Sequence, residues 1–502
     1  MSFGPTTGVS GVGGGSPLLA SVRDLLTRAA RAYAGTPGAT RLNAVLDRLD
    51  EPLRVAIAGK VKAGKSTLLN ALVGEELAPT DAGECTKIVT WYRDGITYRA
   101  TVEPFEGEPR QVPFSRDGGA ITIDLGGAEA ASVERLVVEW PSSSLRQMTL
   151  IDTPGIASLS ADVSARTHAF LTPGEDQVTP ADAVLYLMRH LHASDINFLE
   201  AFHDEEFSQA TPVNAVAVLS RADEVGVGRI DSMASAQKIA RRYRGDPKVR
   251  RLAQTVVPVA GLLAQSGATL REAEYKALDA IAGAPHEESE ALFLSADRFV
   301  SAQTPIQLTT MEREHLLGRL GLFGVRLSVS LIRQGVASNA TTLSTELVRR
   351  SGLVELREVL LSQFAQRRDV LKARSALLAL ERELHERPVP SSDLLATDLE
   401  RITSGAHEFA EIRLLNALRA GGLKVKPADV EEMERLLGAQ GGALYTRLDL
   451  QPGAPVSEVR QALQTAIGRW QRRAESPMSS RDVADAARVI IRTCEGLLVN
   501  VG

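Results

Sequence analysis

The sequence predicts an α/β domain with a mixed, mostly parallel sheet, followed by an all-α part. Between Arg54 and Ala260, short runs rich in Val, Ile and Leu alternate with helical stretches. This alternation is typical of a parallel sheet, and the middle runs are expected to form an antiparallel edge. Strand signals disappear beyond about residue 265. Aromatic residues make up only 4% of the chain, which favours helix packing over a sandwich or barrel core.

The composition excludes several classes of protein. The 502 residues carry a formal net charge of −5, which argues against a general binder of nucleic acid or another polyanion. A hydrophobic content of 44% is enough for a sizeable core, so global disorder is excluded. The two cysteines, Cys85 and Cys494, are too few for a disulfide framework. We therefore expect a protein of the reducing cytoplasm.

Composition shifts along the chain predict four segments. The first is a glycine-rich flexible tail rather than a signal peptide, and the second has apolar residues at helical spacing. The third contains the strand signals, and the fourth contains only helical patterns. The predicted segments are 1–16 as the tail, 17–50 as helices joining a neck, 51–265 as the α/β domain and 266–502 as a helical neck and trunk.

Residues 353–386 contain neither glycine nor proline and predict one long helix. At 1.5 Å per residue it would span about 51 Å, so the trunk is expected to be elongated. The longest apolar run, 320–332, is too short to cross a bilayer and carries Arg326 at its centre, so no transmembrane helix is predicted.

A phosphate-binding loop is predicted where the strand that ends at Gly59 runs into an amphipathic helix. The pattern is glycine, four residues, then Gly64, Lys65 and Ser66. Backbone N–H groups of such a loop wrap a β-phosphate, the lysine reaches the β- and γ-phosphates, and the hydroxyl ligates Mg²⁺. The nucleotide-binding residues expected here are Gly59, Lys60, Val61, Lys62, Ala63, Gly64, Lys65, Ser66 and Thr67.

A second motif, D-T-P-G at 152–155, follows another predicted strand. A carboxylate at a strand end can hold Mg²⁺ through water, so Asp152 is the expected second metal residue beside Ser66. The Gly155 amide can sense the γ-phosphate and couple its loss to movement of the segment that follows. An isolated D-T-P-G could be an ordinary β-turn, but a phosphate-binding loop upstream makes the nucleotide interpretation far more specific.

A threonine between the two motifs is expected to close on Mg²⁺ with its hydroxyl. Thr86 lies just before a predicted strand and is the first choice, with Thr80 and Thr90 as alternatives. Together with Lys65 and Lys62, Thr86 completes the predicted catalytic set. Lys62 would stabilise charge that develops during hydrolysis, although it could equally serve only to balance phosphate charge.

Base selection is expected at S-R-A-D, residues 220–223, where a further strand ends. The Asp223 carboxylate can accept hydrogen bonds from guanine N1–H and N2–H₂, which adenine cannot offer. Ser220 and Arg221 depart from the usual [N/T]-K-x-D, but the Arg221 side chain can still stack along the base. A plain helix N-cap after a strand is the alternative interpretation. Val259 and Ala260 are expected to close over the base.

Together these motifs resemble the bacterial branch of the dynamin superfamily. The resemblance rests on residues 59–72, on D-T-P-G-I at 152–156, on S-R-A-D at 220–223, and on the helices before and after them. It implies an α/β P-loop GTPase head with an elongated all-α neck and trunk. It also implies binding of GTP and GDP with Mg²⁺, a nucleotide-dependent homodimer through the head, and membrane remodelling at the cytoplasmic face.

Two functions remain open at this point. The first is remodelling of an anionic membrane surface through the tip of the trunk, for which 385–393 and 418–429 are candidates. The second segment places Leu423 and Val425 between Lys424 and Lys426 in a turn, although it could equally be a plain helix–helix connection. The alternative function is a soluble GTPase switch or scaffold whose stalk binds a protein partner, such as a longer dynamin-like paralogue. An ATP-using enzyme is disfavoured by Asp223.

Overall fold

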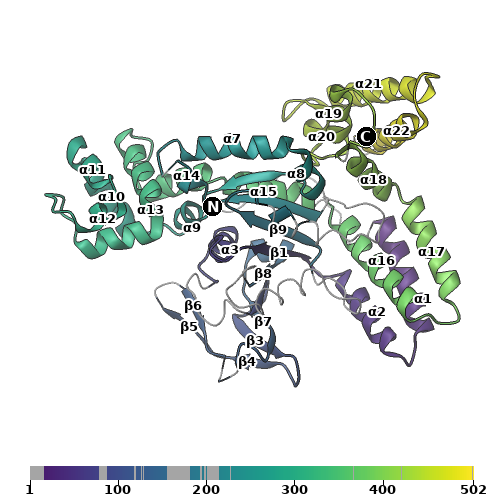
Figure 1. Cartoon of the computed structure of the whole chain (residues 1–502), viewed down its shortest axis with the longest axis horizontal. Helices are drawn as coiled ribbons and strands as arrows, with labels where there is room; N and C mark the ends of the chain where they lie inside the picture. The colour runs from purple at the N-terminus through teal and green to yellow at the C-terminus, as the bar shows by residue number, and fades with distance from the viewer. Residues whose placement is uncertain are drawn as a thin grey trace. The chain divides into compact units, whose positions relative to one another are not determined.

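The computed structural model divides into two compact units (Figure 1). The first comprises residues up to Glu51 together with Gln366–Glu411, and the second comprises Pro52–Ala365 with Ile412–Gly502. The residues that the structure describes are 16–78, 88–117, 120–125, 127, 129–154, 181–192, 195, 196, 199, 214–226, 228–365, 367–419, 421–499 and 501. The domain boundaries predicted near residues 50 and 265 stay a prediction, because compactness alone does not define functional domains.

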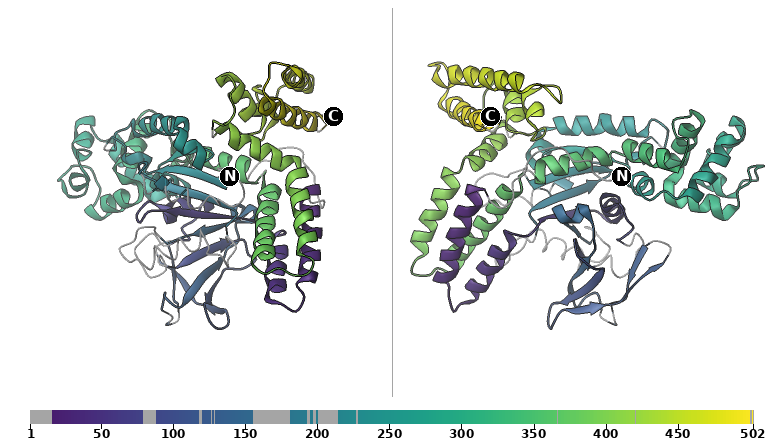
Figure 2. Two further views of the ribbon diagram at one scale, coloured as in Figure 1. Left: turned by 45° about the vertical axis from the view of Figure 1, so that its right-hand side comes forward. Right: turned by 180° about the vertical axis from the view of Figure 1, so that it is seen from behind.

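The first unit is a bundle of four helices that come from distant parts of the sequence (Figure 2). Its members are α1 (Pro17–Ala32), α2 (Pro37–Arg48), α16 (Arg368–Glu386) and α17 (Ser392–Gly405). Apolar residues at three- to four-residue spacing on α1, among them the fully buried Leu25 and Leu26, form its core. Glu383, almost fully buried, accepts two hydrogen bonds from Arg41 at 2.6 and 2.9 Å, which ties α16 to α2.

A nine-stranded mixed sheet forms the centre of the second unit, in the order β11-β10-β9-β1-β8-β2-β7-β3-β4. The five strands from β11 to β8 are parallel, β2 is antiparallel to β8 but parallel to β7, and β3 and β4 complete an antiparallel edge. This confirms the predicted fold class. The strands are β1 (Leu53–Gly59), β2 (Val89–Arg93), β3 (Arg99–Pro104), β4 (Arg110–Val112), β7 (Val133–Glu139), β8 (Met148–Asp152), β9 (Ala183–Met188), β10 (Ala215–Ser220) and β11 (Val256–Val259).

Three short strands were not expected from the sequence. β4 has three residues, and the separate hairpin of β5 (Phe114–Asp117) and β6 (Ala120–Ile123) has four in each strand. Strands of this length carry too few alternating residues to give a recognisable pattern. They lie away from the phosphate-binding loop in the sequence and do not change the predicted site.

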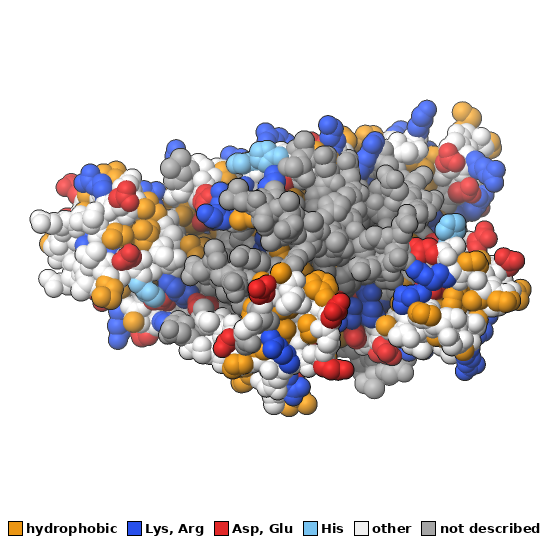
Figure 3. Space-filling view, turned by 60° about the horizontal axis from the view of Figure 1, so that its bottom comes forward, with side chains coloured by type: hydrophobic (Ala, Val, Ile, Leu, Met, Phe, Trp, Pro, Cys, Tyr) orange, Lys and Arg blue, Asp and Glu red, His pale blue; other side chains and the backbone are white. Residues whose placement is uncertain are grey.

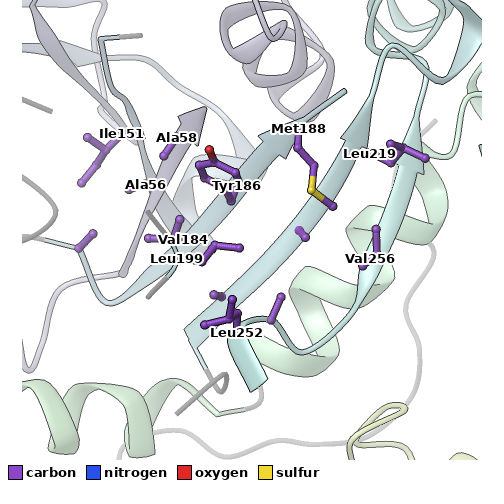
Figure 4. Packing of buried hydrophobic residues seen from close by; sticks show 14 of the residues in the cluster. Ala56, Ala58, Ile151, Val184, Tyr186, Met188, Leu199, Leu219, Leu252 and Val256 are labelled. Carbon is purple, nitrogen blue, oxygen red and sulfur yellow. The ribbon is translucent and has the colours of Figure 1, made fainter. Parts of the chain in front are cut away.

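Side chains from seven strands and two helices contribute to the core on one face of the sheet, and Figure 4 shows part of it. Ala56 and Ala58 of β1 pack there with Val184, Tyr186 and other buried residues. The helices over this face are α7 (Ser232–Gly245) and α8 (Pro247–Leu252), which bury small residues such as Ala236. Because every residue of β9 and β10 is buried, these strands read as continuous apolar runs, as central parallel strands do.

The helices after β11 form a second core in the same unit. They are α9 (Gly261–Ala268), α10 (Glu272–Gly283), α11 (His286–Leu292), α12 (Ala296–Ser301), α13 (Thr310–Arg333) and α14 (Ala340–Arg350). Of the helices described, α13 alone is long and apolar enough to cross a membrane. Half of its most apolar stretch is buried in the protein, and Arg326 donates to the carbonyls of Gly228 and Phe293. These contacts are those of a core helix.

The prediction of a single helix over residues 353–386 is wrong. The chain instead forms α15 (Leu353–Val359), a π-helical turn over Leu360–Ala365, and then α16. Tertiary contacts override helix propensity here, because Phe364 is fully buried and Gln363 Nε2 donates to the carbonyls of Gly438 and Ala439 at 3.2 and 3.1 Å. The break coincides with the passage from one compact unit to the other.

The C-terminal helices fold onto a core of their own. α18 (His407–Arg419) leads to α19 (Pro427–Leu436), α20 (Leu444–Leu448), α21 (Val456–Glu475) and α22 (Arg481–Val499). Leu423, predicted to be an exposed membrane contact, instead packs partly against this core, while Lys424 and Lys426 are exposed. The apolar side chain is used inside the protein, which favours the interpretation of this turn as a helix–helix connection.

Candidate functional site

The loop between β1 and α3 (Lys65–Val73) has the geometry of a phosphate cradle. Gly59 has φ +149°, and a Cβ there would lie 2.5 Å from the Leu187 carbonyl oxygen, so only glycine fits. Gly64, at the N-cap of α3, is left-handed with φ +92°. Lys62 is also left-handed, with φ 61°. These dihedrals turn the loop sharply into the helix, where unpaired N–H groups favour an anion.

Lys65 lies over the loop and is largely buried. Its Nζ donates to the carbonyl oxygens of Gly59 at 3.3 Å and Lys60 at 3.4 Å. Burial lowers the pKa of Lys65, and the nearby charge of Asp152 acts in the opposite direction. A partly buried ammonium whose hydrogen bonds within the described residues go to backbone carbonyls is poised to gain from an anionic ligand.

Ser66 and Asp152 meet at the carboxyl end of the central strands β1 and β8, although their positions in the sequence differ by 86. The Ser66 Oγ donates to Asp152 Oδ2 at 2.8 Å, while the buried Oδ1 finds no hydrogen-bond partner among the described residues. Burial raises the pKa of Asp152, and Lys65 and Ser66 oppose that shift. An orphaned carboxylate oxygen beside a hydroxyl at a helix N-terminus fits a hard divalent cation such as Mg²⁺.

Thr153 fastens the start of the D-T-P-G segment to β1. Its backbone N–H and its Oγ1 both donate to the Ile57 carbonyl, at 3.3 and 2.9 Å. Gly155, Thr86 and the alternative Thr80 lie outside the described residues. Thr90, the other alternative, is buried within β2, and its hydroxyl donates to the Ile88 carbonyl.

A pocket opens beside the loop, with a volume of about 560 Å³ that is partly open to solvent. Its lining brings together predicted residues from three motifs, including Gly64, Asp223 and Val259. Ala260, also predicted, is buried at the N-cap of α9. The sequence did not single out the other apolar residues of the wall, which are Leu68, Leu187, Val218 and Leu262. The lining residues are Ala63, Gly64, Thr67, Leu68, Leu187, Val218, Ser220, Arg221, Asp223, Glu224, Val259, Gly261 and Leu262.

Arg221 differs from the expectation that it would be available for stacking on a base. It is left-handed, with φ 52°, and its guanidinium donates to the Lys62 carbonyl at 2.9 Å and to Glu224 at 2.5 Å. Its side chain lines the pocket and fastens the phosphate-binding loop to β10. Asp223 lines the same pocket next to Arg221, and burial raises the pKa of its carboxyl group.

Two residues that fix the loop from β9 were not predicted. Asp195, which is 1% exposed, pairs with Lys60 Nζ at 3.1 Å and accepts a hydrogen bond from the Tyr186 hydroxyl at 2.7 Å. Arg189 donates to the Lys62 carbonyl at 3.3 Å. Neither residue belongs to a recognisable motif, so only their position just after a buried strand could have indicated them. Lys60 is thus held by a buried carboxylate, whereas the side chains of Val61 and Lys62 are exposed.

Comparison with known proteins identifies the family of this chain. The model of the dynamin family matches residues 55–215. The isoniazid-induced protein IniC of Mycobacterium tuberculosis is 40% identical over 484 residues, which cover 95% of this chain and 97% of IniC. The chain belongs to the dynamin family. Its α/β head is a dynamin-family GTPase domain, and such a domain binds GTP.

Other relatives match shorter parts of this dynamin-family chain. The bacterial dynamin-like protein of Nostoc punctiforme is 33% identical over 147 residues, or 27% of this chain and 20% of its own. The isoniazid-induced protein IniA of M. tuberculosis is 27% identical over 311 residues, or 58% of this chain and 42% of IniA. A solved oligomerised bacterial dynamin pair, described as sensing and tethering membranes over long range, aligns with 99% of this chain and 76% of its own, at 13% identity and a TM-score of 0.30.

Proposed function

We propose that this GTPase hydrolyses GTP with Mg²⁺ and couples the GTP/GDP cycle to membrane remodelling at the cytoplasmic face. The observation that carries the proposal is the meeting of Ser66 with the half-satisfied carboxylate of Asp152, directly beside the phosphate loop. The pocket lined by Asp223 continues from the same loop. The residues proposed to bind the phosphates, the metal and the base thus belong to one site.

The residues of this chain divide the work of hydrolysis. The N–H groups of residues 59–66 bind the phosphates, and Lys65 exchanges its weak bonds to backbone carbonyls for the β- and γ-phosphate oxygens. Ser66 and Asp152, with Thr86, would hold the metal, and a metal bound there would supply positive charge against the charge that develops on the γ-phosphate. Thr86 and its backbone also position the attacking water, and the Gly155 amide reports loss of the γ-phosphate.

Guanine is selected by Asp223. Its carboxylate is partly buried and has few partners in the described residues, so the donors at guanine N1 and N2 compensate for its desolvation. Adenine would leave it unpaired. Arg221 supports this choice indirectly, because it holds the loop that carries the phosphates against the strand that carries the base.

Metal participation is tested by nucleotide affinity and not only by turnover. Asp152→Asn should reduce the gain in GTP affinity that Mg²⁺ gives the wild-type protein, while affinity measured in excess EDTA stays close to wild type. Glu139→Gln, on β7 and three strands away from β1 in the sheet order, is the control. An unchanged Mg²⁺ effect in Asp152→Asn would remove Asp152 from the metal site.

Membrane contact is the second part of the proposal. Basic, acidic and hydrophobic side chains are mixed over the described part of the face in Figure 3. Since Leu423 packs inward, contact at the 418–429 turn would depend on Val425 and on the exposed Lys424 and Lys426. Each lysine near an anionic surface contributes about 1 kcal/mol, so a single protomer would bind weakly and would need avidity from an oligomer.

The alternative function is a GTPase switch whose helices bind a protein partner. The inward packing of Leu423 favours it, and so does the similarity of this chain both to IniC and to the longer IniA of the same organism. A longer dynamin-like paralogue would then make the membrane contact. Anionic liposomes decide between the two: remodelling predicts co-sedimentation that falls with salt and in Lys424→Glu/Lys426→Glu. Wild-type protein that stays in the supernatant at low salt, with any nucleotide, supports the partner-binding function.

A further inference from the structure

The C-terminal end of α3, opposite the phosphate-binding end, is held by residues from much later in the chain. The last carbonyl groups of a helix have no partner within the helix. In α3 the carbonyl oxygens of Ala71 and Leu72 accept hydrogen bonds from Arg357 Nη2, at 3.0 and 3.2 Å. Burial lowers the pKa of Arg357. Its guanidinium therefore caps the phosphate-binding helix from behind, where a cation also opposes the helix dipole favourably.

The helix that carries Arg357 is at the same time fixed against the base side of the pocket. The Ser351 carbonyl accepts a hydrogen bond from the Ala260 N–H at 2.9 Å. Gly352 has φ +82°, and a Cβ there would lie 2.1 Å from the Pro258 carbonyl oxygen. Arg244 links Glu355 at 2.6 Å to the Val256 carbonyl at 2.7 Å. These contacts join α15 to β11, whose Val259 lines the pocket.

A second arginine holds the segment just after α3. Arg319 of α13 bonds to Glu76 at 2.5 Å and to Glu274 at 2.8 Å, and it also donates to the carbonyl and hydroxyl oxygens of Thr269. All three charged side chains are at most 16% exposed. Close by, Gly321 interrupts α13 with φ 63° and ψ 169°, and a Cβ at Gly321 would lie 3.5 Å from Leu262 of the pocket wall.

We infer that Arg357 and Arg319 are positioning residues for the guanine nucleotide. They clamp the C-terminal end of α3 to helices that are themselves fixed against the base wall. We call these Arg357 and Arg319 contacts the clamp. The clamp sets the distance between the phosphate-binding end of α3 and the Asp223 side chain. The helices after β11 are therefore part of the nucleotide site rather than only a neck. The inference rests on the assignment of α3 as the phosphate-binding helix.

The test is the effect of Arg357→Met on nucleotide affinity and kinetics, with Arg357→Lys as the conservative variant. Losing two charge-assisted hydrogen bonds should raise the Kd for fluorescent GDP and the KM for GTP about tenfold, with kcat within about twofold of wild type. Arg357→Lys keeps the charge but loses the planar guanidinium group, so its Kd and KM should lie between those of wild type and Arg357→Met. Arg349→Met is the matched control, because Arg349 is exposed and pairs only with Glu346 in the described contacts.

All measurements are made well below the unfolding midpoint of each variant. If Arg357→Met, or Arg357→Lys where the methionine variant does not fold, lowers the midpoint but keeps wild-type Kd and KM, the residue is only structural and the inference is overturned. The variant Lys65→Ala distinguishes failure of the clamp inference from failure of the phosphate-site assignment. Loss of nucleotide binding in Lys65→Ala beside unchanged Arg357 variants rejects the clamp alone, whereas wild-type binding in Lys65→Ala rejects the phosphate site as well.

Discussion

At the scale of single residues, Asp223 and Glu224 offer a direct comparison, since both are carboxylates that line the pocket. Glu224 is paired with Arg221, whereas the carboxyl group of Asp223 is desolvated and has a raised pKa. The two side chains are neighbours in the sequence but differ in what they can offer a base. Of these two carboxylates, Asp223 is therefore the one that we expect to accept the guanine donors.

We predict that Asp223→Asn loses its preference for GTP and gains affinity for xanthosine triphosphate. The amide presents a donor where the carboxylate only accepts, and the 2-oxo group of xanthine matches that donor. Glu224→Gln should keep the wild-type base preference. Competition binding with GTP, ATP and xanthosine triphosphate measures both variants, and an unchanged GTP preference in Asp223→Asn would assign base selection elsewhere.

Glu274 should make the stability of the protein depend on pH. Burial raises the pKa of this carboxyl group, but hydrogen bonds from Arg319, from the Arg271 backbone and from His315 outweigh burial and hold the pKa below its ordinary value. A lowered folded-state pKa gives stability that is present above the unfolded pKa and is lost as the pH falls through the folded one.

We predict that Glu274→Gln lowers the free energy of unfolding by about 2 to 3 kcal/mol at neutral pH, since it removes one partner of a buried pair. The difference from wild type should shrink as the pH falls below the ordinary pKa of a glutamate, 4.5, and through the lowered folded-state pKa, where the wild-type carboxylate becomes protonated. Denaturant titrations over this range measure it. The control Glu346→Gln, in a pair with the exposed Arg349, should cost under about 1 kcal/mol. A constant difference across the range would contradict the ion-pair explanation.

At the scale of elements, the short helix α15 depends on the backbone conformation of Gly352. A left-handed φ and a contact with the Pro258 carbonyl leave no room for a side chain. We predict that Gly352→Ala costs about 3 kcal/mol or more of stability. Gly318→Ala, inside α13 with open space around its Cβ, should be neutral or stabilising by up to about 1 kcal/mol. The midpoint of thermal unfolding should therefore fall in Gly352→Ala and stay unchanged or rise in Gly318→Ala, and equal midpoints would contradict the close packing.

Elements with a strong local pattern were predictable, and elements set by distant contacts were not. The buried strands β9 and β10, and the glycines of the phosphate loop, follow from apolar runs and from spacing. The break at residues 360–365 depends on Gln363 reaching the turn at 438–439, which no local pattern encodes. Asp195 and Arg189 were missed for the same reason, because each acts through a loop brought close by the sheet.

At the scale of the whole molecule, the exposed apex of the phosphate loop suggests activation by a second head. Val61 is 47% exposed, and Lys62 beside it is exposed as well. The residue after D-T-P-G is Ile156, so the water-orienting glutamine of small GTPases is absent at that place in the sequence. A contact that covers the apex would exclude water from the site and help to hold Thr86, which is expected to position the nucleophile.

We predict that specific activity rises with protein concentration. Turnover per protomer should increase several-fold over about a hundredfold range of concentration, since a bimolecular contact precedes the fast step. Lys62→Glu should flatten this dependence while GDP affinity at low concentration stays near wild type. Constant specific activity over the whole range would contradict activation by a homodimer of heads.

The central claim is that one Mg²⁺-dependent site, built from residues 59–66, Asp152 and Asp223, hydrolyses GTP. The most direct test is steady-state phosphate release by wild-type protein and Lys65→Ala, with GTP or ATP and with or without EDTA. We predict Mg²⁺-dependent hydrolysis of GTP by wild type, at least about tenfold slower release from ATP, and background rates in Lys65→Ala. Wild-type rates in Lys65→Ala, or equal rates with GTP and ATP, would contradict the account.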